Sequence, residues 1–124
     1  MKLLDSNILI YAAEPGAKAL RERILAEPAG VSVATMVEVL GYHRLTSEEE
    51  VELRGLLKEL TVFAADIMVA ERAVALRQKQ KMGLGDAIIA ATALVHHLPL
   101  VTRNVDDFKH IAGLDVQNPF APGI

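Results

Sequence analysis

The sequence contains no cysteine and no tryptophan, and only 4% of its residues are aromatic. Without cysteine the chain has no disulfide, thiolate metal ligand or thiol nucleophile, which is typical of proteins from a reducing compartment such as the cytoplasm. Few aromatic side chains also mean few platforms on which nucleic-acid bases stack. A net charge of −3 points the same way, so composition by itself argues against nucleic acid as a ligand.

The sequence also lacks a long, uniformly apolar run. Near the N-terminus, Asp5 and Asn7 interrupt the apolar residues that an export signal needs. The longest stretch with a single formal charge, residues 82–102, is broken by Asp86 and Pro99. It predicts a buried helix rather than a membrane span.

What the chain does have is enough apolar material for one core. Its 124 residues are 52% hydrophobic and 23% charged, with a mean hydropathy of +0.28. This composition is too apolar for a disordered chain, and a chain of this length buries about two-thirds of its unfolded surface. We therefore expect a single domain over residues 1–124.

Short apolar runs alternate with amphipathic segments along the chain. Strands that alternate with helices at this spacing form right-handed crossovers and a mostly parallel sheet covered on both faces, so the predicted fold is a three-layer α/β/α arrangement. Thr46 with Glu49 predicts a capping box, and Asp66 a cap, at two helix starts. The expected strands are 2–4, 31–33, 61–64, 100–103 and one ending at 116, and the expected helices are 8–13, 17–26, 34–42, 46–60, 67–81, 87–96 and a turn at 106–111, with a non-helical turn at 82–85.

Three acids stand alone in apolar segments: Asp5, Glu38 and Asp86. Each is the only charged residue in a stretch of at least 11 residues. We expect these segments to be largely buried, and a buried carboxylate without a partner is strongly destabilising. Each acid therefore needs a helix-capping role, a cation partner or a metal ion.

The predicted topology brings these acids toward one edge of the sheet. In an open parallel sheet, residues that follow strands gather at the carboxyl edge, where ligands bind. Six polar side chains are expected to meet there: Asp5 after the first strand, Glu38 and Asp86 on flanking helices, and Asn104, Asp106 and Asp107 after the fourth strand.

A cluster of carboxylates requires a positive partner. Two like charges about 4 Å apart repel by roughly 4 kcal/mol at an intermediate dielectric. Oxygen-only ligands select hard cations such as Mg²⁺ or Mn²⁺, and two such ions about 3.5–4 Å apart commonly serve phosphodiester hydrolysis. The cluster therefore predicts metal-assisted hydrolysis without a Ser, His or Cys nucleophile.

Each acid also has a purely structural interpretation. The structural alternatives for the acids are a helix cap for Asp5, a first-turn acid for Asp86, an ion pair with Lys81 or Arg103 for Glu38, and an exposed turn for Asp106 and Asp107.

The two adjacent histidines are not expected to bind a metal. Because the side chains of neighbouring residues diverge, His96 and His97 fit a helix end better than a metal site.

Taken together, the motifs resemble the PIN domain, and in particular the VapC-type toxins of bacterial and archaeal toxin–antitoxin pairs. The similarity runs from LLDSNILIYA through VEVLGY and GLGDAIIAATALVHHLPLVTRNVDDF to DVQNP, and so covers nearly the whole chain. It implies a PIN-like fold and a cytoplasmic, Mg²⁺-dependent endoribonuclease that cleaves RNA of the tRNA or rRNA class.

The resemblance also implies partners. VapC-type toxins form homodimers, and a VapB-like antitoxin wraps the toxin with its C-terminal segment and places a basic side chain near the acids. Residues around Ile8, Tyr11 and Leu20 would line a groove for that segment, or they belong to the core.

The resemblance assigns roles to individual residues. Three acids match the acidic positions of the family, and Asn104 stands where many PIN domains carry a further Asp. Asp107 is then the fourth charged member. The expected catalytic acids are Asp5, Glu38, Asp86 and Asp107, Asn104 joins them as a neutral metal ligand, and Asn7 and Thr102 orient their carboxylates.

Other functions stay open at this point. Asn104 in place of an acid also suits a catalytically silent PIN-like domain that binds RNA or a partner, and a PIN nuclease can act without an antitoxin. A domain phosphorylated on Asp5 is a poorer match, because the Asp-x-Asp pair and a Lys after a late strand are missing.

The negative net charge is concentrated in the proposed site. Setting aside its five acids, with Asp106 counted, leaves 11 acidic against 13 basic residues, a net charge of +2. A mildly basic domain around a cation-filled acidic site is compatible with RNA, which reverses the first impression from composition.

Overall fold

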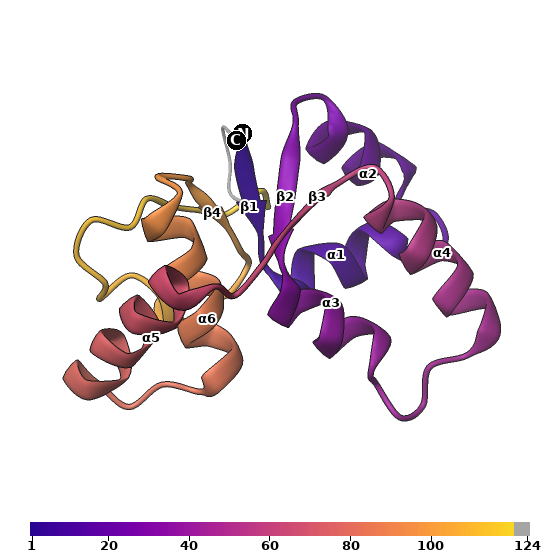
Figure 1. Ribbon diagram of the computed structural model, residues 1–124. Helices are drawn as coiled ribbons and strands as arrows, with labels where there is room; N and C mark the ends of the chain where they lie inside the picture. The colour runs from indigo at the N-terminus through magenta and orange to yellow at the C-terminus, as the bar shows by residue number, and fades with distance from the viewer. Residues whose placement is uncertain (121–124) are drawn as a thin grey trace.

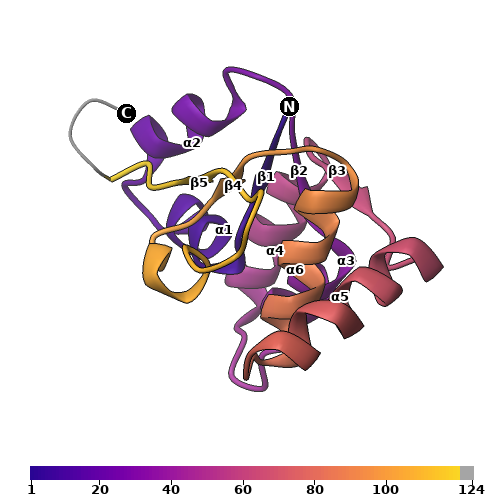
Figure 2. The same ribbon diagram turned by 90° about the vertical axis from the view of Figure 1, so that its left-hand side faces the viewer.

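The computed structural model describes residues 1–120, and its centre is a five-stranded parallel sheet. The strands are β1 (Lys2–Leu4), β2 (Ala29–Ser32), β3 (Thr61–Phe63), β4 (Leu100–Val101) and β5 (Val116–Gln117). Their order in the sheet is β3-β2-β1-β4-β5, and every neighbouring pair is parallel (Figure 2).

Helices cover both faces of this sheet (Figure 1). One layer consists of α1 (Ser6–Ala13), α2 (Lys18–Leu25), α3 (Val33–Leu40) and α4 (Ser47–Leu57), and the other of α5 (Ile67–Lys79) and α6 (Leu84–Val95). A short 3-10 helix, η1 (Val105–Asp107), follows β4. The predicted three-layer α/β/α fold is confirmed, and no helix within residues 1–120 is long and apolar enough to span a membrane.

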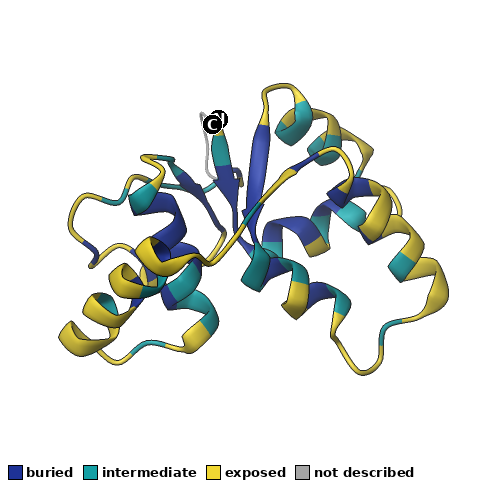
Figure 3. Ribbon diagram, viewed as in Figure 1, coloured by how far each residue is buried: buried dark blue, intermediate teal, exposed yellow. Residues whose placement is uncertain are grey.

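The strands alternate their side chains between the two helical layers, as the pleat of a strand requires. Leu4, Val31 and Val101 pack toward α1 and α4. Leu3 and Leu100 point the other way, toward α6. The strands are accordingly almost entirely buried at the centre of the sheet (Figure 3).

The predicted caps are present at their expected helix starts. Thr46 and Glu49 form a complete capping box before α4, and Asp66 accepts a hydrogen bond from the Val69 N–H at 3.0 Å. Ile8, which was considered for a groove, is fully buried in the core. The prediction of a groove at Ile8 is therefore wrong.

The start of α6 differs from the prediction. Residues 82–85 were expected to form a turn, but Gly83 is the N-cap and the helix begins at Leu84. The two glycines suggested a turn because glycine disfavours helix interiors. Gly85 instead lies in the first helical turn, where the missing side chain leaves room for Glu38.

The strand order places a topological switch point at the carboxyl edge, which is where parallel α/β folds form a ligand crevice. From β1 the chain moves outward through β2 to β3, and then returns to the opposite side of β1 as β4. The segments after β1 and β4 therefore diverge to opposite faces of the sheet, which is the arrangement that opens ligand sites in parallel α/β folds. Asp5 follows β1, and Thr102 and Asn104 follow β4.

Candidate active site

Asp5 is a buried carboxylate held in one orientation. It is the N-cap of α1, and its Oδ1 accepts the Ser6 N–H at 2.8 Å. Its Oδ2 accepts the Asn7 side-chain amide at 3.2 Å and the Thr102 hydroxyl at 2.7 Å. The helix-cap interpretation is confirmed, and Asn7 and Thr102 contact the carboxylate as predicted.

A chain of donors fixes the direction of the Thr102 hydroxyl. The Asn104 N–H donates to Thr102 Oγ1 at 3.0 Å, so the hydroxyl proton is directed to Asp5. Thr102 is fully buried. The turn after β4 thus orients the carboxylate that follows β1, on the neighbouring strand.

Glu38 itself is exposed, although most of the segment around it, from residue 29 to 40, is buried or half-buried as predicted. Glu38 lies on α3 beside the start of α1, where the Ser6 hydroxyl lies 3.2 Å from Glu38 Oε1 and 3.1 Å from Thr35 Oγ1. No ion pair within residues 1–120 involves Glu38, so the proposed pairing with Lys81 or Arg103 is not formed.

Asp86 lies in the first turn of α6 and is influenced by the charges of the other acids. Its pKa is raised above the ordinary value by partial burial and then by the charges of Asp5, Asp107 and Glu38. Burial also raises the pKa of Asp5, against the hydrogen bonds from Thr102 and Ser6, and Asp107 raises it further. The structure therefore brings the four predicted catalytic acids together.

The residues after β4 divide into two groups. The charge of Asp107 contributes to the raised pKa values of Asp5 and Asp86, whereas Asp106 is exposed and pairs with Lys109 at 2.9 Å. Asn104 is exposed and lines an open hollow beside Asp107. Asp106 is therefore a surface residue, and Asn104 lies at the rim of the cluster.

The donor set of this cluster suits a hard divalent cation. All its side-chain donors are oxygens, and after burial the charges of neighbouring acids contribute to the raised pKa values of Asp5 and Asp86. Within residues 1–120 no three Asp, Glu or His side chains already form a metal-binding arrangement. By chemistry the residues that would hold Mg²⁺ or Mn²⁺ are Asp5, Glu38, Asp86 and Asp107, with Asn104 at the rim.

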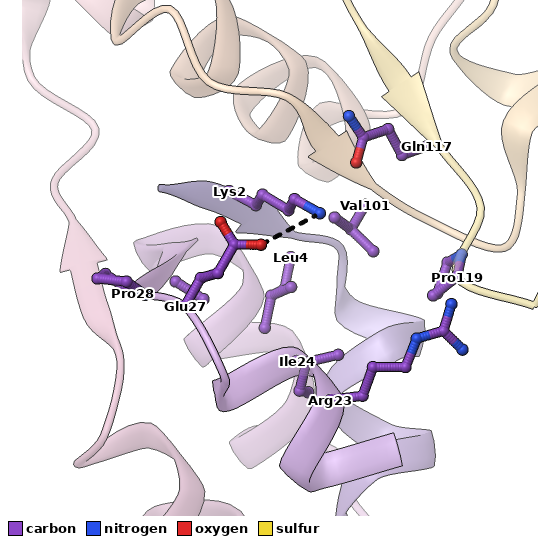
Figure 4. Close-up of a pocket in the computed structure, with 10 residues that line it drawn as sticks. Lys2, Leu4, Arg23, Ile24, Glu27, Pro28, Val101, Gln117 and Pro119 are labelled. Atoms are coloured by element: carbon purple, nitrogen blue, oxygen red, sulfur yellow. Dashed lines mark ion pairs between the residues drawn. The ribbon is translucent and has the colours of Figure 1, made fainter. Parts of the chain in front are cut away.

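A second pocket lies between α2 and the sheet and is not lined by carboxylates of the cluster (Figure 4). Its volume is about 50 Å³, and its one carboxylate, Glu27, pairs with Lys2 at 3.8 Å. The other labelled residues that line it are Leu4, Arg23, Ile24, Pro28, Val101, Gln117 and Pro119.

Comparison with known proteins accounts for this arrangement. The family model described as PIN domain matches residues 2–114. The chain belongs to the PIN domain family. The resemblance stated from the motifs is confirmed, and the four acids stand at the carboxyl edge of a PIN-domain sheet.

Individual relatives of this PIN domain are of the VapC type. Ribonuclease VapC10 of Mycobacterium tuberculosis is 36% identical over 133 residues, which cover 99% of this chain and 96% of the relative. A solved toxin–antitoxin complex from Klebsiella pneumoniae includes a chain with 38% identity and a TM-score of 0.73, matched over 92% of this chain and 95% of that one. The structure of VapBC2 from Rickettsia felis bound to a promoter DNA fragment has a TM-score of 0.80 at 21% identity, covers 94% and 97%, and supports the fold.

Two residues that contact the PIN-domain acids were missed in the sequence. The Ser6 hydroxyl contacts Glu38, 32 residues away, and Gly85 lets the same carboxylate lie against α6. Neither residue was predicted to belong to the site, and Gly85 was expected only as part of a turn. No local pattern reveals either contact, because both depend on how α3 packs beside α1 and α6.

Asp86→Asn is expected to raise the melting temperature of the metal-free protein. Raised pKa values mean that the folded chain binds protons more strongly than the unfolded chain, so the free energy of unfolding falls as pH rises through the raised values. At neutral pH the ionised cluster is therefore destabilising. Calorimetry in EDTA should show the gain, and added Mg²⁺ should stabilise the variant less than the wild type.

Asp106→Asn is the matched control for this experiment, because Asp106 is exposed and paired with Lys109. It should change neither the metal-free melting temperature nor the Mg²⁺ shift appreciably. If Asp86→Asn instead lowers the melting temperature in EDTA, Asp86 is a stabilising first-turn acid rather than part of a repelling cluster.

Gly85→Ala is expected to displace Glu38 while preserving the fold. A Cβ at position 85 would lie 2.9 Å from Glu38 Oε1, so the flexible end of that side chain must move. Alanine is otherwise the better helix residue. Titration calorimetry should show weaker Mg²⁺ binding, whereas Gly55→Ala in α4, where a Cβ meets nothing within 4 Å, should leave it unchanged. Unaltered Mg²⁺ affinity in Gly85→Ala would remove Glu38 from the metal site.

Proposed function

We propose that this PIN domain is a divalent-metal-dependent endoribonuclease that uses Mg²⁺, with Mn²⁺ as a substitute, and cleaves RNA of the tRNA or rRNA class. The observation that carries the proposal is the meeting of four acids from four separate segments at the carboxyl edge, where burial and then the charges of the other three raise the pKa of Asp86. The relative named Ribonuclease VapC10, 36% identical along nearly the whole chain, supports RNA as the substrate.

The catalytic roles follow from what holds each acid. When bound, the metal supplies Lewis-acid activation of the phosphodiester and of the attacking water. Three hydrogen bonds hold the Asp5 carboxylate, so it needs little reorganisation when substrate binds. Ser6 and Gly85 position Glu38 from two sides. Asp86 and Asp107 complete the negative lining.

We also propose that the domain is a toxin controlled by a VapB-like antitoxin. The solved toxin–antitoxin complex whose chain is 38% identical to this one supports a partner of that kind. An open groove between α2 and α4 offers a docking surface, with exposed Val51 beside Glu59 and beside Glu52, which pairs with Arg21 at 3.5 Å. An amphipathic helix with basic residues on its polar side would fit this groove.

A homodimer is the assembly that we propose for this domain. The outer face of α5 and the start of α6 expose large apolar side chains that a monomer leaves in water. This face would be the contact between two copies. Its exposed residues are Ile67, Met68, Val74 and Leu84.

We further propose that the protein is a single domain that works in the cytoplasm. The strands and helices within residues 1–120 share one sheet and its two covering layers, with no second unit. A chain without cysteine suits a reducing compartment, and the proposed RNA substrates are found there.

Asp5→Asn is expected to abolish RNA cleavage by the purified chain. Removing a residue that supports a metal ligand commonly lowers metal affinity or activity about 10- to 100-fold, so loss of a ligand itself should lower the cleavage rate more than about 100-fold. Cleavage of labelled tRNA and rRNA with Mg²⁺ or Mn²⁺ measures the effect. Asp106→Asn, which alters an exposed acid two residues from Asn104, should retain wild-type activity.

Two results would overturn the nuclease proposal. One is a wild-type chain that cleaves none of these RNAs with either ion, and the other is Asp5→Asn that cleaves at the wild-type rate. RNA binding without cleavage would leave the catalytically silent PIN-like domain as the better description.

A further inference from the structure

Arg103 is held by two aromatic rings at the rim of the acidic cluster. Its guanidinium carbon lies 5.2 Å from the centroid of the Tyr11 ring and 4.9 Å from that of Phe120. The two rings contact each other edge to face at 5.6 Å. Such cation–π contacts restrain an exposed arginine in one place. We call Arg103, Tyr11 and Phe120 the arginine clamp.

The arginine clamp is connected to the proposed catalytic acids through Asn7. The backbone N–H of Arg103 donates to Asn7 Oδ1 at 3.4 Å, and the Asn7 amide donates to Asp5 Oδ2 at 3.2 Å. Arg103 also directly follows Thr102, which holds the same carboxylate. The fold therefore fixes the position of this cation relative to Asp5.

In the described part of the chain the guanidinium of Arg103 has no ion-pair partner. Arg103 lines an open hollow of about 370 Å³ with Asp106 and Asp107. Lys109 pairs with Asp106 at 2.9 Å, and Asp107 belongs to the acidic cluster. Arg103 thus lines the same hollow as Asp107, one of the acids that would hold the metal.

We propose that the arginine clamp binds a backbone phosphate of the RNA next to the phosphodiester that is cleaved. This inference rests on the proposed nuclease function and names how that site holds its substrate. A guanidinium offers paired N–H donors that match phosphate oxygens, and stacking leaves its edge free to donate.

The surroundings of the clamp favour RNA over an acidic peptide. Two of the five aromatic residues of a chain poor in aromatics, Tyr11 and Phe120, gather at this one arginine. Phe120 is 44% exposed, so part of its surface remains available to a base. The clamp also borders the acids that must meet a phosphodiester, and a bound polynucleotide supplies a neighbouring phosphate there.

Fluorescence anisotropy with a short labelled single-stranded RNA tests the clamp. All proteins carry Asp86→Asn, so that the RNA is not cut, and binding is measured over a series of salt concentrations. Arg103→Ala should weaken binding about tenfold at low salt and make the slope of log K against log salt shallower by about 0.7, the value of one lost phosphate contact. Arg103→Lys should keep the slope and lose part of the affinity.

The control is Arg72→Ala, which removes an exposed arginine of the same charge near Val95, at the far end of α6 from Asp86. It should change neither affinity nor slope. Phe120→Leu should lie between wild type and Arg103→Ala, because it loosens the guanidinium without removing its charge. The clamp proposal is overturned if Arg103→Ala keeps the full slope, if Arg72→Ala lowers the slope equally, or if only antitoxin binding is lost.

The test separates this inference from the nuclease proposal. If wild type cleaves RNA but Arg103→Ala leaves RNA affinity and KM unchanged, the clamp fails and the nuclease proposal stands. If Arg103→Ala lowers the salt slope while wild type cuts no RNA with Mg²⁺ or Mn²⁺, the clamp stands as a phosphate site on a silent domain.

Discussion

Repulsion among four carboxylates is the constraint on which the site of this PIN domain depends. Partial burial is the first cause of the raised pKa of Asp86, and the charges of Asp5, Asp107 and Glu38 raise it further. A fold optimised only for stability would not gather these charges at one edge of its sheet. The hydrogen bonds around Asp5 and the contacts of Glu38 hold the acids in place against that repulsion, which a divalent cation would relieve.

Structural and functional interpretations of a residue are not exclusive here. Asp5 caps α1 through its Oδ1 and directs its Oδ2 to Thr102 and Asn7, so one carboxylate both starts a helix and belongs to the cluster. Asp86 likewise lies in the first turn of α6, where an acid is favourable, and takes part in the electrostatic coupling. The strand order then brings both helix starts to the same edge of the sheet.

The layers of the fold and the acids of the site could be predicted from the sequence, but the exposure and contacts of individual site residues could not. Strand and helix alternation, with caps such as Thr46 and Asp66, was enough to predict the α/β/α fold. The exposure of Glu38 was not, because apolar neighbours on a helix do not show which face meets the core, and adjacent Val37 is 66% exposed. The contacts of Gly85 with Glu38 join distant segments, so only the packed fold reveals them.

Crystals soaked in MnCl₂ and measured at the manganese absorption edge test the central claim most directly. The account predicts an anomalous peak between the carboxylates of Asp5 and Asp86, with Glu38 and Asp107 drawn toward it, because one cation relieves the repulsion of all four. Manganese bound only at exposed acids such as Asp106, with the cluster unchanged and free of metal, would contradict it.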